Sequence, residues 1–228
     1  MAISRPSTRW LLLLALSLLL ISCSLGQGPI DPSDYRFEEP VPFYLYLPDG
    51  YSQNERWPLF VGVHGSSTDG RACWNTWQPY ADDEGFVLLC PELADPDGIL
   101  HQLHGADRLN LILNRIYQEY SLQSAIFITG FSAGGQFVHG YAFQYPQYVA
   151  AASVMAPGDY YLPPPSARSI PFAISIGAWE NPAIVQALAA ALQQNGNSVQ
   201  LHIIPGVGHS VSTEAIRLTL DLFEAELP

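Results

Sequence analysis

The amino-acid sequence predicts an α/β fold, in which a mainly parallel sheet carries helices on both faces. Short apolar segments with strand character alternate with longer segments whose apolar residues recur at helical spacing. Of the 228 residues, 48% are hydrophobic, which is enough to bury one sizeable core. No internal repeat is visible in the sequence. We therefore expect one globular domain.

The first residues have the pattern of an export signal. Arg5 and Arg9 form a basic start ahead of an apolar run over residues 10–21, which is shorter than the roughly 20 residues that span a membrane. The run ends in a sequence that resembles a lipobox, with Cys23 as the residue that carries the lipid. We expect a lipoprotein-type signal peptide over residues 1–22 and an exported protein held at a membrane surface through Cys23. Cleavage nearby, which gives a freely secreted protein, is the alternative.

Residues 23–40 are polar and rich in proline, so we expect a tether ahead of a single domain over residues 41–228.

The net charge limits which partners the protein can bind, and export affects the redox state of its cysteines. The chain has 21 acidic and 9 basic residues, a net charge of −12, so no nucleic-acid surface is expected. Export favours a disulfide between Cys73 and Cys90. Two separate buried thiols are the alternative, because the sequence does not give the distance between the two residues.

Strand patterns and turns organise the first half of the domain. Residues 41–47 are aromatic and β-prone, and they end at a Pro-Asp-Gly turn. Residues 59–63 and 86–89 are short apolar runs that predict buried strands. An irregular loop is expected over residues 92–105. Apolar residues at helical spacing then predict an amphipathic helix over residues 107–120.

The alternation continues through the middle of the chain. Residues 125–129 predict a buried strand, and residues 133–144 predict the helix that follows it. Residues 149–155 are apolar again and predict another strand. A proline-rich loop over residues 157–171 separates it from a strand over residues 172–176.

The C-terminal part completes the pattern. A helix is expected over residues 182–195, with Asn181 as its N-cap and Gly196 as its end. Residues 199–204 predict the last strand, and residues 212–227 predict the last helix. Strands that alternate with helices in this way predict a parallel sheet covered on both faces.

The segment Gly130-Phe131-Ser132-Ala133-Gly134 fits the pattern G-x-S-x-G. A predicted strand precedes it and a predicted helix follows. A serine on such a tight turn stands clear of the sheet, and the flanking glycines allow the strained backbone to pack closely. Ser132 is therefore predicted to be a nucleophile. The alternative is a helix of small residues that packs tightly on the sheet.

A serine hydroxyl needs a base and an acid that orients it. The order of the three groups on this scaffold is serine, acid, histidine. His209 lies in a glycine-rich loop between the last strand and the last helix, at the same sheet edge as Ser132, and it is the expected base. Glu180 follows the strand over residues 172–176 and is the expected acid. Asp159, which follows the strand before it, is the alternative acid.

Backbone N–H groups would stabilise the oxyanion that forms on the substrate. The N–H of Ala133, at the start of a helix, is one expected donor. The second is the N–H of Ser66, because His64-Gly65-Ser66 ends an earlier strand at the same sheet edge. His64 itself is expected to be structural.

Four segments, YLPDGYSQNERWPLFVGVHG, YADDEGFVLLCPE, ITGFSAGG and PGVGH, occur in this order within residues 44–211. With these segments the chain resembles an α/β-hydrolase of the polyhydroxybutyrate depolymerase-like and feruloyl esterase-like group. The resemblance implies an α/β-hydrolase fold without a large lid, Ser132 as the nucleophile and His209 as the base. It places Glu180 where an aspartate is usual, which departs from the common pattern.

Two loops, over residues 92–105 and 157–171, are expected to shape the substrate site, because ligands bind at the carboxyl ends of the strands in such sheets. Core packing and substrate stacking are both open roles for five aromatic residues near these ends: Trp74, Trp77, Tyr160, Tyr161 and Trp179. His101 and His104 form a pair without an evident third ligand, so no metal is expected, and no cofactor is implied.

Together these features predict a serine carboxylic-ester hydrolase that acts through an acyl-enzyme on an ester outside the cytoplasm. The substrate would be a polyester, a phenolic ester or an acetyl ester. A serine peptidase of the same fold is one alternative. The other is a surface-anchored binding protein that keeps the fold without catalysis.

Overall fold

The computed structural model describes residues 31–227. Its strands form one sheet and comprise β1 (Arg36–Phe37), β2 (Phe43–Tyr46), β3 (Trp57–Val63), β4 (Val87–Pro91), β5 (Leu122–Phe131), β6 (Val149–Met155), β7 (Phe172–Gly177) and β8 (Val199–Ile204). The α-helices are α1 (Gly70–Glu84), α2 (Gln102–Glu119), α3 (Ala133–Gln144), α4 (Ala183–Asn195) and α5 (Thr213–Glu226). Short 3₁₀ turns are η1 (Pro32–Tyr35), η2 (Pro146–Tyr148) and η3 (Pro165–Ala167).

The strand order across the sheet is β1-β2-β4-β3-β5-β6-β7-β8. Strands β3 to β8 run parallel to one another, while β2 pairs antiparallel with β4, and β1 antiparallel with β2. The chain moves from β3 to β4 on one side and then returns past β3 to β5. The ends of β3 and β5 therefore lie side by side at the carboxyl edge of the sheet, where ligands bind on sheets of this type.

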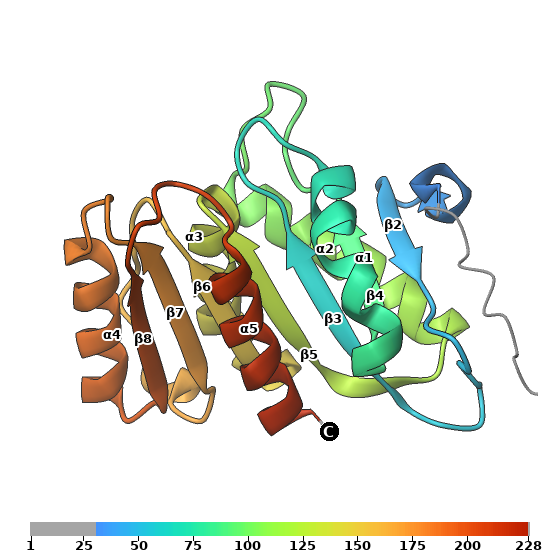
Figure 1. Cartoon of the computed structure of the whole chain (residues 1–228). Helices are drawn as coiled ribbons and strands as arrows, with labels where there is room; N and C mark the ends of the chain where they lie inside the picture. Colours follow the sequence, from blue (N-terminus) through green and yellow to red (C-terminus); the bar gives the residue numbers. More distant parts are fainter. Residues whose placement is uncertain (1–30, 228) are drawn as a thin grey trace, which may run out of the picture. The chain divides into compact units, whose positions relative to one another are not determined.

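Helices cover both faces of the sheet, with α1 and α5 on one face and α2 and α3 on the other (Figure 1). Alternate residues of β3 divide between the two cores, as the period of a strand requires. Leu59, Val61 and Val63 belong to a core cluster that includes the buried residues of α2, α3 and α4. Phe60 points the opposite way, and its ring stacks between those of Phe86 and Phe127 at 4.5 and 4.9 Å.

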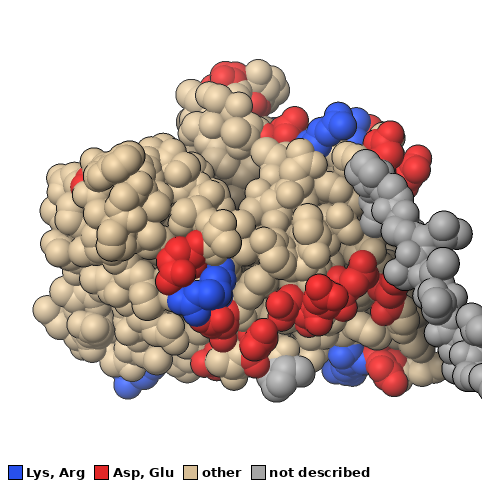
Figure 2. Space-filling view, in the orientation of Figure 1, with Lys and Arg blue, Asp and Glu red and all other residues tan. Residues whose placement is uncertain are grey.

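Acidic side chains gather in a band over the lower ends of α1 and α5 (Figure 2). Glu84, near the end of α1, interacts there with Glu224 of α5, and Asp83 and Asp221 add further negative charge. Burial, followed by these neighbouring carboxylates, raises the pKa of Glu84. The concentration of charge thus falls at the amino-terminal ends of the strands, away from the edge where the predicted site lies.

The predicted α/β class, with a mainly parallel sheet and helices on both faces, is confirmed. Helix α1, however, was not predicted. Asp69 caps it by accepting a hydrogen bond from the Ala72 N–H at 3.0 Å, and it ends at Gly85 in the left-handed conformation. Its buried residues Trp74 and Trp77 recur at helical spacing, so the signal was present in the sequence.

Two predicted boundaries are corrected. Helix α2 begins at Gln102, inside the segment 92–105 that was expected to be an irregular loop. Residues 32–37, which were expected to lie in a tether over residues 23–40, instead form η1 and β1. Strand β1 pairs with β2, and the ring of Phe37 stacks on that of Phe43 at 4.9 Å. From Pro32 onward the chain forms one compact unit.

Candidate active site

Ser132 occupies a sharp turn between β5 and α3. Its φ of 57° and ψ of −121° lie in a region that non-glycine residues rarely adopt, so the turn stores strain. The turn is possible because small residues surround it. A Cβ on Gly130 would lie 2.5 Å from the Gly134 carbonyl, and one on Gly134 would collide with the carbonyl of Val63. The glycines expected around the serine are therefore required by backbone contacts.

The structure brings together Ser132, His209 and Glu180, which come from three separate loops. The Ser132 hydroxyl lies 3.0 Å from His209 Nε2, and His209 Nδ1 lies 2.5 Å from Glu180 Oε2. A carboxylate oxygen only accepts, so Nδ1 carries the proton and Nε2 is left to accept from the serine hydroxyl. Phe131, the residue before Ser132, packs against the imidazole of His209, with the ring centroids 4.6 Å apart. This geometry can move a proton away from Ser132.

The loops that carry Glu180 and His209 are tied to each other. Ala178 N–H donates to the Ile204 carbonyl at 2.8 Å, and Trp179 N–H donates to the Val207 carbonyl at 3.0 Å. A Cβ on Gly177 would lie 2.5 Å from the Gly208 carbonyl, so only glycine permits this approach. The distance between the carboxylate and the imidazole is thus set by backbone hydrogen bonds.

Glu180 is more buried than His209, with side-chain exposures of 19% and 52%. One carboxylate oxygen of Glu180 binds His209, whereas the buried Oε1 has no hydrogen-bond partner within residues 31–227. Asp159, the alternative acid, is exposed in the β6–β7 connection, and its carboxylate accepts from the N–H of Tyr160. The described hydrogen bonds connect His209 to Glu180 and not to Asp159.

The two residues expected to bind an oxyanion, Ala133 and Ser66, belong to segments that meet at Ser132. Ala133 is the first residue of α3, directly after the serine. The β3–α1 loop, which carries Ser66, passes so close to the turn that a Cβ on Gly65 would lie 3.6 Å from the Ser132 Cβ. Among the described hydrogen bonds, neither the Ala133 nor the Ser66 N–H donates to a protein acceptor. Both donors are therefore available to a substrate oxygen.

Two buried histidines hold loops at this edge. His64 accepts a hydrogen bond at Nε2 from the Leu93 N–H at 3.2 Å, which agrees with its expected structural role. His139, on α3, accepts from the Tyr161 N–H at 3.1 Å and donates from Nδ1 to the Gly135 carbonyl at 3.0 Å. Burial lowers the pKa of His139 to about 4, so its ring is neutral at neutral pH. The contact between His139 and the proline-rich loop has no signal in the sequence.

The aromatic residues near the site divide between two roles. Trp74 and Trp77 are 2% and 3% exposed and pack in the core, and Trp77 also lines a hollow beside the turn. Trp179 is 77% exposed beside Glu180, and Tyr161 is 41% exposed. A hollow of about 150 Å³ lies next to the turn, with Phe131, Met155 and other residues in its wall. The site is open, and the longest connection over it spans residues 156–171.

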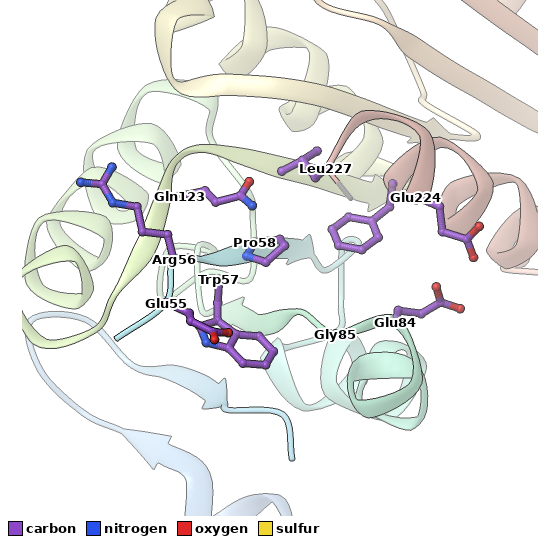
Figure 3. A pocket seen from close by; sticks show the side chains of 10 residues that line it. Glu55, Arg56, Trp57, Pro58, Glu84, Gly85, Gln123, Glu224 and Leu227 are labelled. Carbon is purple, nitrogen blue, oxygen red and sulfur yellow. The ribbon is translucent and has the colours of Figure 1, made fainter. Parts of the chain in front are cut away.

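A larger hollow, of about 490 Å³, lies elsewhere (Figure 3). Its wall includes Trp57 at the start of β3, Gly85 after α1 and Phe223 on α5. These positions are at the amino-terminal ends of the strands, and none of the three hydrogen-bonded residues of the candidate site lines it. Size alone therefore does not identify the site, and the chemistry favours the edge at Ser132.

Other predicted residues are placed as follows. Cys73 and Cys90 are joined in a disulfide, with their Cα atoms 5.8 Å apart. Within residues 31–227 no group of three or more His, Cys, Asp or Glu side chains is arranged to hold a metal ion. His104 instead contacts the carboxylate of Asp95 at 2.8 Å, which Arg108 also contacts at 2.9 Å.

The predicted signal peptide and Cys23 lie outside the described residues. No helix in the described part has the length and apolar character needed to cross a membrane.

Comparisons with known proteins were made on both sequence and structure. No family model matches the chain. The chain is 28% identical over 128 residues to feruloyl esterase B of Thermothelomyces thermophilus; this match covers 50% of the chain and 43% of the relative. The chain thus matches less than half the length of this curated relative.

Solved structures match over most of the chain. Esterase PE8 superimposes with a TM-score of 0.65 at 18% identity, over 80% of this chain and 97% of that one. A ferulic acid esterase from Anaeromyces mucronatus, solved in complex with ferulic acid, gives a TM-score of 0.63 at 14% identity, over 86% of this chain and 96% of that one. The expected fold is therefore confirmed: the chain has the α/β-hydrolase fold, in the form found in esterases.

Proposed function

We propose that the protein is a serine carboxylic-ester hydrolase and that Ser132, His209 and Glu180 are its catalytic triad. The observation that carries the proposal is the continuous hydrogen-bonded chain from the Ser132 hydroxyl through His209 to Glu180, with distances of 3.0 and 2.5 Å. The sequence similarity to a feruloyl esterase and the fold shared with esterases support it.

In this mechanism the Ser132 hydroxyl attacks the ester carbonyl as His209 Nε2 takes its proton. Glu180 accepts from Nδ1 and stabilises the imidazolium that forms. The N–H groups of Ala133 and Ser66 bind the oxyanion of the tetrahedral intermediate. The proton then passes from His209 to the leaving alcohol, and an acyl-Ser132 ester remains. A water molecule, activated by His209, releases the acid and restores the serine.

The substrate class follows from the open edge and its exposed aromatic side chains. Trp179, next to Glu180, and Tyr161, which contacts Gln136 of α3, are exposed and can stack on a planar acyl group. The relative is a feruloyl esterase, and one neighbour binds ferulic acid. We therefore favour a phenolic ester over a polyester or an acetyl ester. We also keep the proposal of export and attachment to a membrane surface through Cys23, which rests on the sequence pattern alone.

A fluorophosphonate probe tests the nucleophile directly. Residues 24–228 should be labelled covalently, and Ser132→Ala should not be labelled while its circular dichroism stays that of the wild type. Hydrolysis of methyl ferulate, a polyester film and p-nitrophenyl acetate then ranks the three ester classes. A folded wild type that takes no label would rule out the triad and favour a binding protein. Labelling with turnover of amides in preference to esters would favour a peptidase.

A further inference from the structure

A second concave surface lies at the opposite end of β5 from Ser132. Two hollows of about 340 Å³ each meet there and share Tyr117 and Ser124 in their walls. We call the combined surface the tyrosine groove and define it by the residues that the argument uses: Asn110, Asn114, Tyr117, Tyr120, Ser124, Tyr145 and Tyr148. Ser124 lies eight residues before Ser132 on an extended strand, so the groove is about 25 Å from the nucleophile.

The groove combines flat aromatic faces from two parts of the chain. Tyr117 and Tyr120 come from the end of α2, and Tyr145 and Tyr148 come from the turn after α3. The rings of Tyr145 and Tyr148 are nearly parallel, at 25°, with their centroids 6.4 Å apart. Tyr148 is 48% exposed. The Tyr117 hydroxyl donates to the Gln123 carbonyl at 3.1 Å, which fixes that ring in the wall. These rings are arranged before any ligand binds.

Polar groups with unused hydrogen-bonding capacity lie between the rings. Asn114 and Ser124 are exposed, and their side chains make no hydrogen bond to another described residue. The Oδ1 of Asn110 accepts from the Tyr141 hydroxyl at 2.7 Å, which leaves its amide N–H groups free to donate. The groove therefore offers donors and acceptors next to apolar faces.

The charges around the tyrosine groove limit the class of ligand that it can bind. No carboxylate lines either hollow, and the only charged side chain in their walls is Arg56, at the far end of the second. Figure 3 shows Arg56 at the border of the neighbouring 490 Å³ hollow. The chain carries a net charge of −12, which disfavours nucleic acid and other polyanions. A neutral ligand with flat apolar faces and many hydroxyl groups matches this lining, and sugar rings have these properties.

We propose that the tyrosine groove binds a neutral polysaccharide chain at a site separate from the ester site. Pyranose or furanose rings stack on Tyr145 and Tyr148, and their hydroxyl groups bond to Asn110, Asn114 and Ser124. Holding the polymer to the enzyme raises the concentration of its ester side groups near Ser132 without any change at the triad. This inference goes beyond the proposed function, because binding at the groove requires no catalysis.

Affinity electrophoresis on native gels tests the groove. The probe is linear xylan freed of its ester groups by alkali, so that Ser132 has nothing to act on. The wild type and Ser132→Ala should both be retarded by the polymer. Tyr148→Ala and Asn114→Ala should each weaken retardation, up to roughly tenfold for the loss of the stacked ring. Leu111→Ala is the matched control, since Leu111 is 50% exposed on the same helix but does not line the groove.

Turnover of a soluble ester, p-nitrophenyl acetate, should be unchanged in Tyr148→Ala and Asn114→Ala. The proposal is overturned if xylan does not retard the wild type, or if these two variants bind as the wild type does. The proposal is also overturned if the electrophoretic mobility of the protein depends on its concentration in gels without xylan. In that case a second copy of the chain would occupy the tyrosine groove. Retardation that depends on Tyr148 in a protein without esterase activity would support the groove and count only against the proposed function.

Discussion

The side chain of His139 accepts a hydrogen bond from the backbone N–H of Tyr161 at 3.1 Å. This contact ties the connection between β6 and β7 to α3, the helix that begins directly after Ser132. A second link joins the same two elements, because Gln136 Nε2 donates to the Tyr161 hydroxyl at 3.3 Å. The loop expected to shape the substrate site is therefore positioned by the helix that begins directly after the nucleophile.

Loss of this acceptor should act on substrate binding more than on chemistry. We expect His139→Ala to raise KM about three- to tenfold, as for the loss of one buried hydrogen bond, with kcat changed less. Steady-state kinetics on methyl ferulate measure both constants. Tyr161→Phe is the comparison, because it removes only the link to Gln136 and keeps the backbone N–H that His139 binds, so KM should rise less than in His139→Ala. A fall in kcat with constant KM would contradict a positioning role.

His139 should also make the stability of the fold depend on pH. Burial lowers the pKa of His139 from 6.5 to about 4, so between these values the unfolded chain binds a proton that the folded protein does not. Stability from this residue is present above about pH 6.5 and is lost as the pH falls toward about 4. We expect a loss of about 2 kcal/mol between pH 7 and pH 4.5. Urea denaturation should show a smaller fall for His139→Gln, and equal falls in both proteins would refute the assignment.

Glu180 and Asp159 should differ sharply in their effect on catalysis. Glu180→Gln removes the negative charge that stabilises the His209 imidazolium, and we expect kcat to fall by about 10³- to 10⁴-fold. Asp159→Asn should stay within about twofold of the wild type, since its carboxylate bonds locally to the Tyr160 N–H. Hydrolysis of p-nitrophenyl acetate measures both variants. The opposite ranking would make Asp159 the acid.

The Cys73–Cys90 disulfide should stabilise the fold. It joins residues 17 apart in sequence, and closing a loop of this length contributes about 3 kcal/mol to the free energy of unfolding. Denaturation in urea with and without dithiothreitol measures the contribution. The double variant Cys73→Ala/Cys90→Ala should not respond to the reductant. A wild type that is equally indifferent to it would mean that the two thiols are not bonded in solution.

The acidic band should make the fold less stable as the pH rises, whereas His139 makes it less stable as the pH falls. Burial and the Glu224 carboxylate raise the pKa of Glu84 above its ordinary 4.5, so its ionisation destabilises the fold as the pH rises through the folded value. Figure 3 shows both side chains at the same end of the hollow. We expect Glu84→Gln to raise Tm at pH 7, with a gain that shrinks toward pH 4. Glu224→Gln should behave alike, and a lower Tm at pH 7 for either variant would contradict the account.

The sequence predicted the elements whose signals are local. Gly130 and Gly134 around Ser132, and the loop positions of Glu180 and His209, follow from strand and helix patterns and from chain order. The contact of Tyr161 with His139 has no such signal, because it joins positions 22 residues apart through an irregular loop. Strand β1 was missed for a similar reason, since two residues become a strand only by pairing with β2. Trp74 and Trp77 show the limit for aromatic residues, whose burial depends on which helix face meets the sheet.

The glycines at 130, 134 and 135 have a consequence for anyone who wishes to redirect this protein to a new substrate. Each faces backbone atoms of a neighbouring strand or turn, and a backbone cannot step aside as a side chain can. Libraries that vary these positions will consist mostly of misfolded members. In the connection over residues 156–171, a Cβ on Gly158 would meet only the end of the Gln136 side chain, at 3.9 Å. Diversity therefore belongs at Gly158 and at the exposed Trp179, where a replaced side chain alters what enters the site and leaves the backbone around Ser132 untouched.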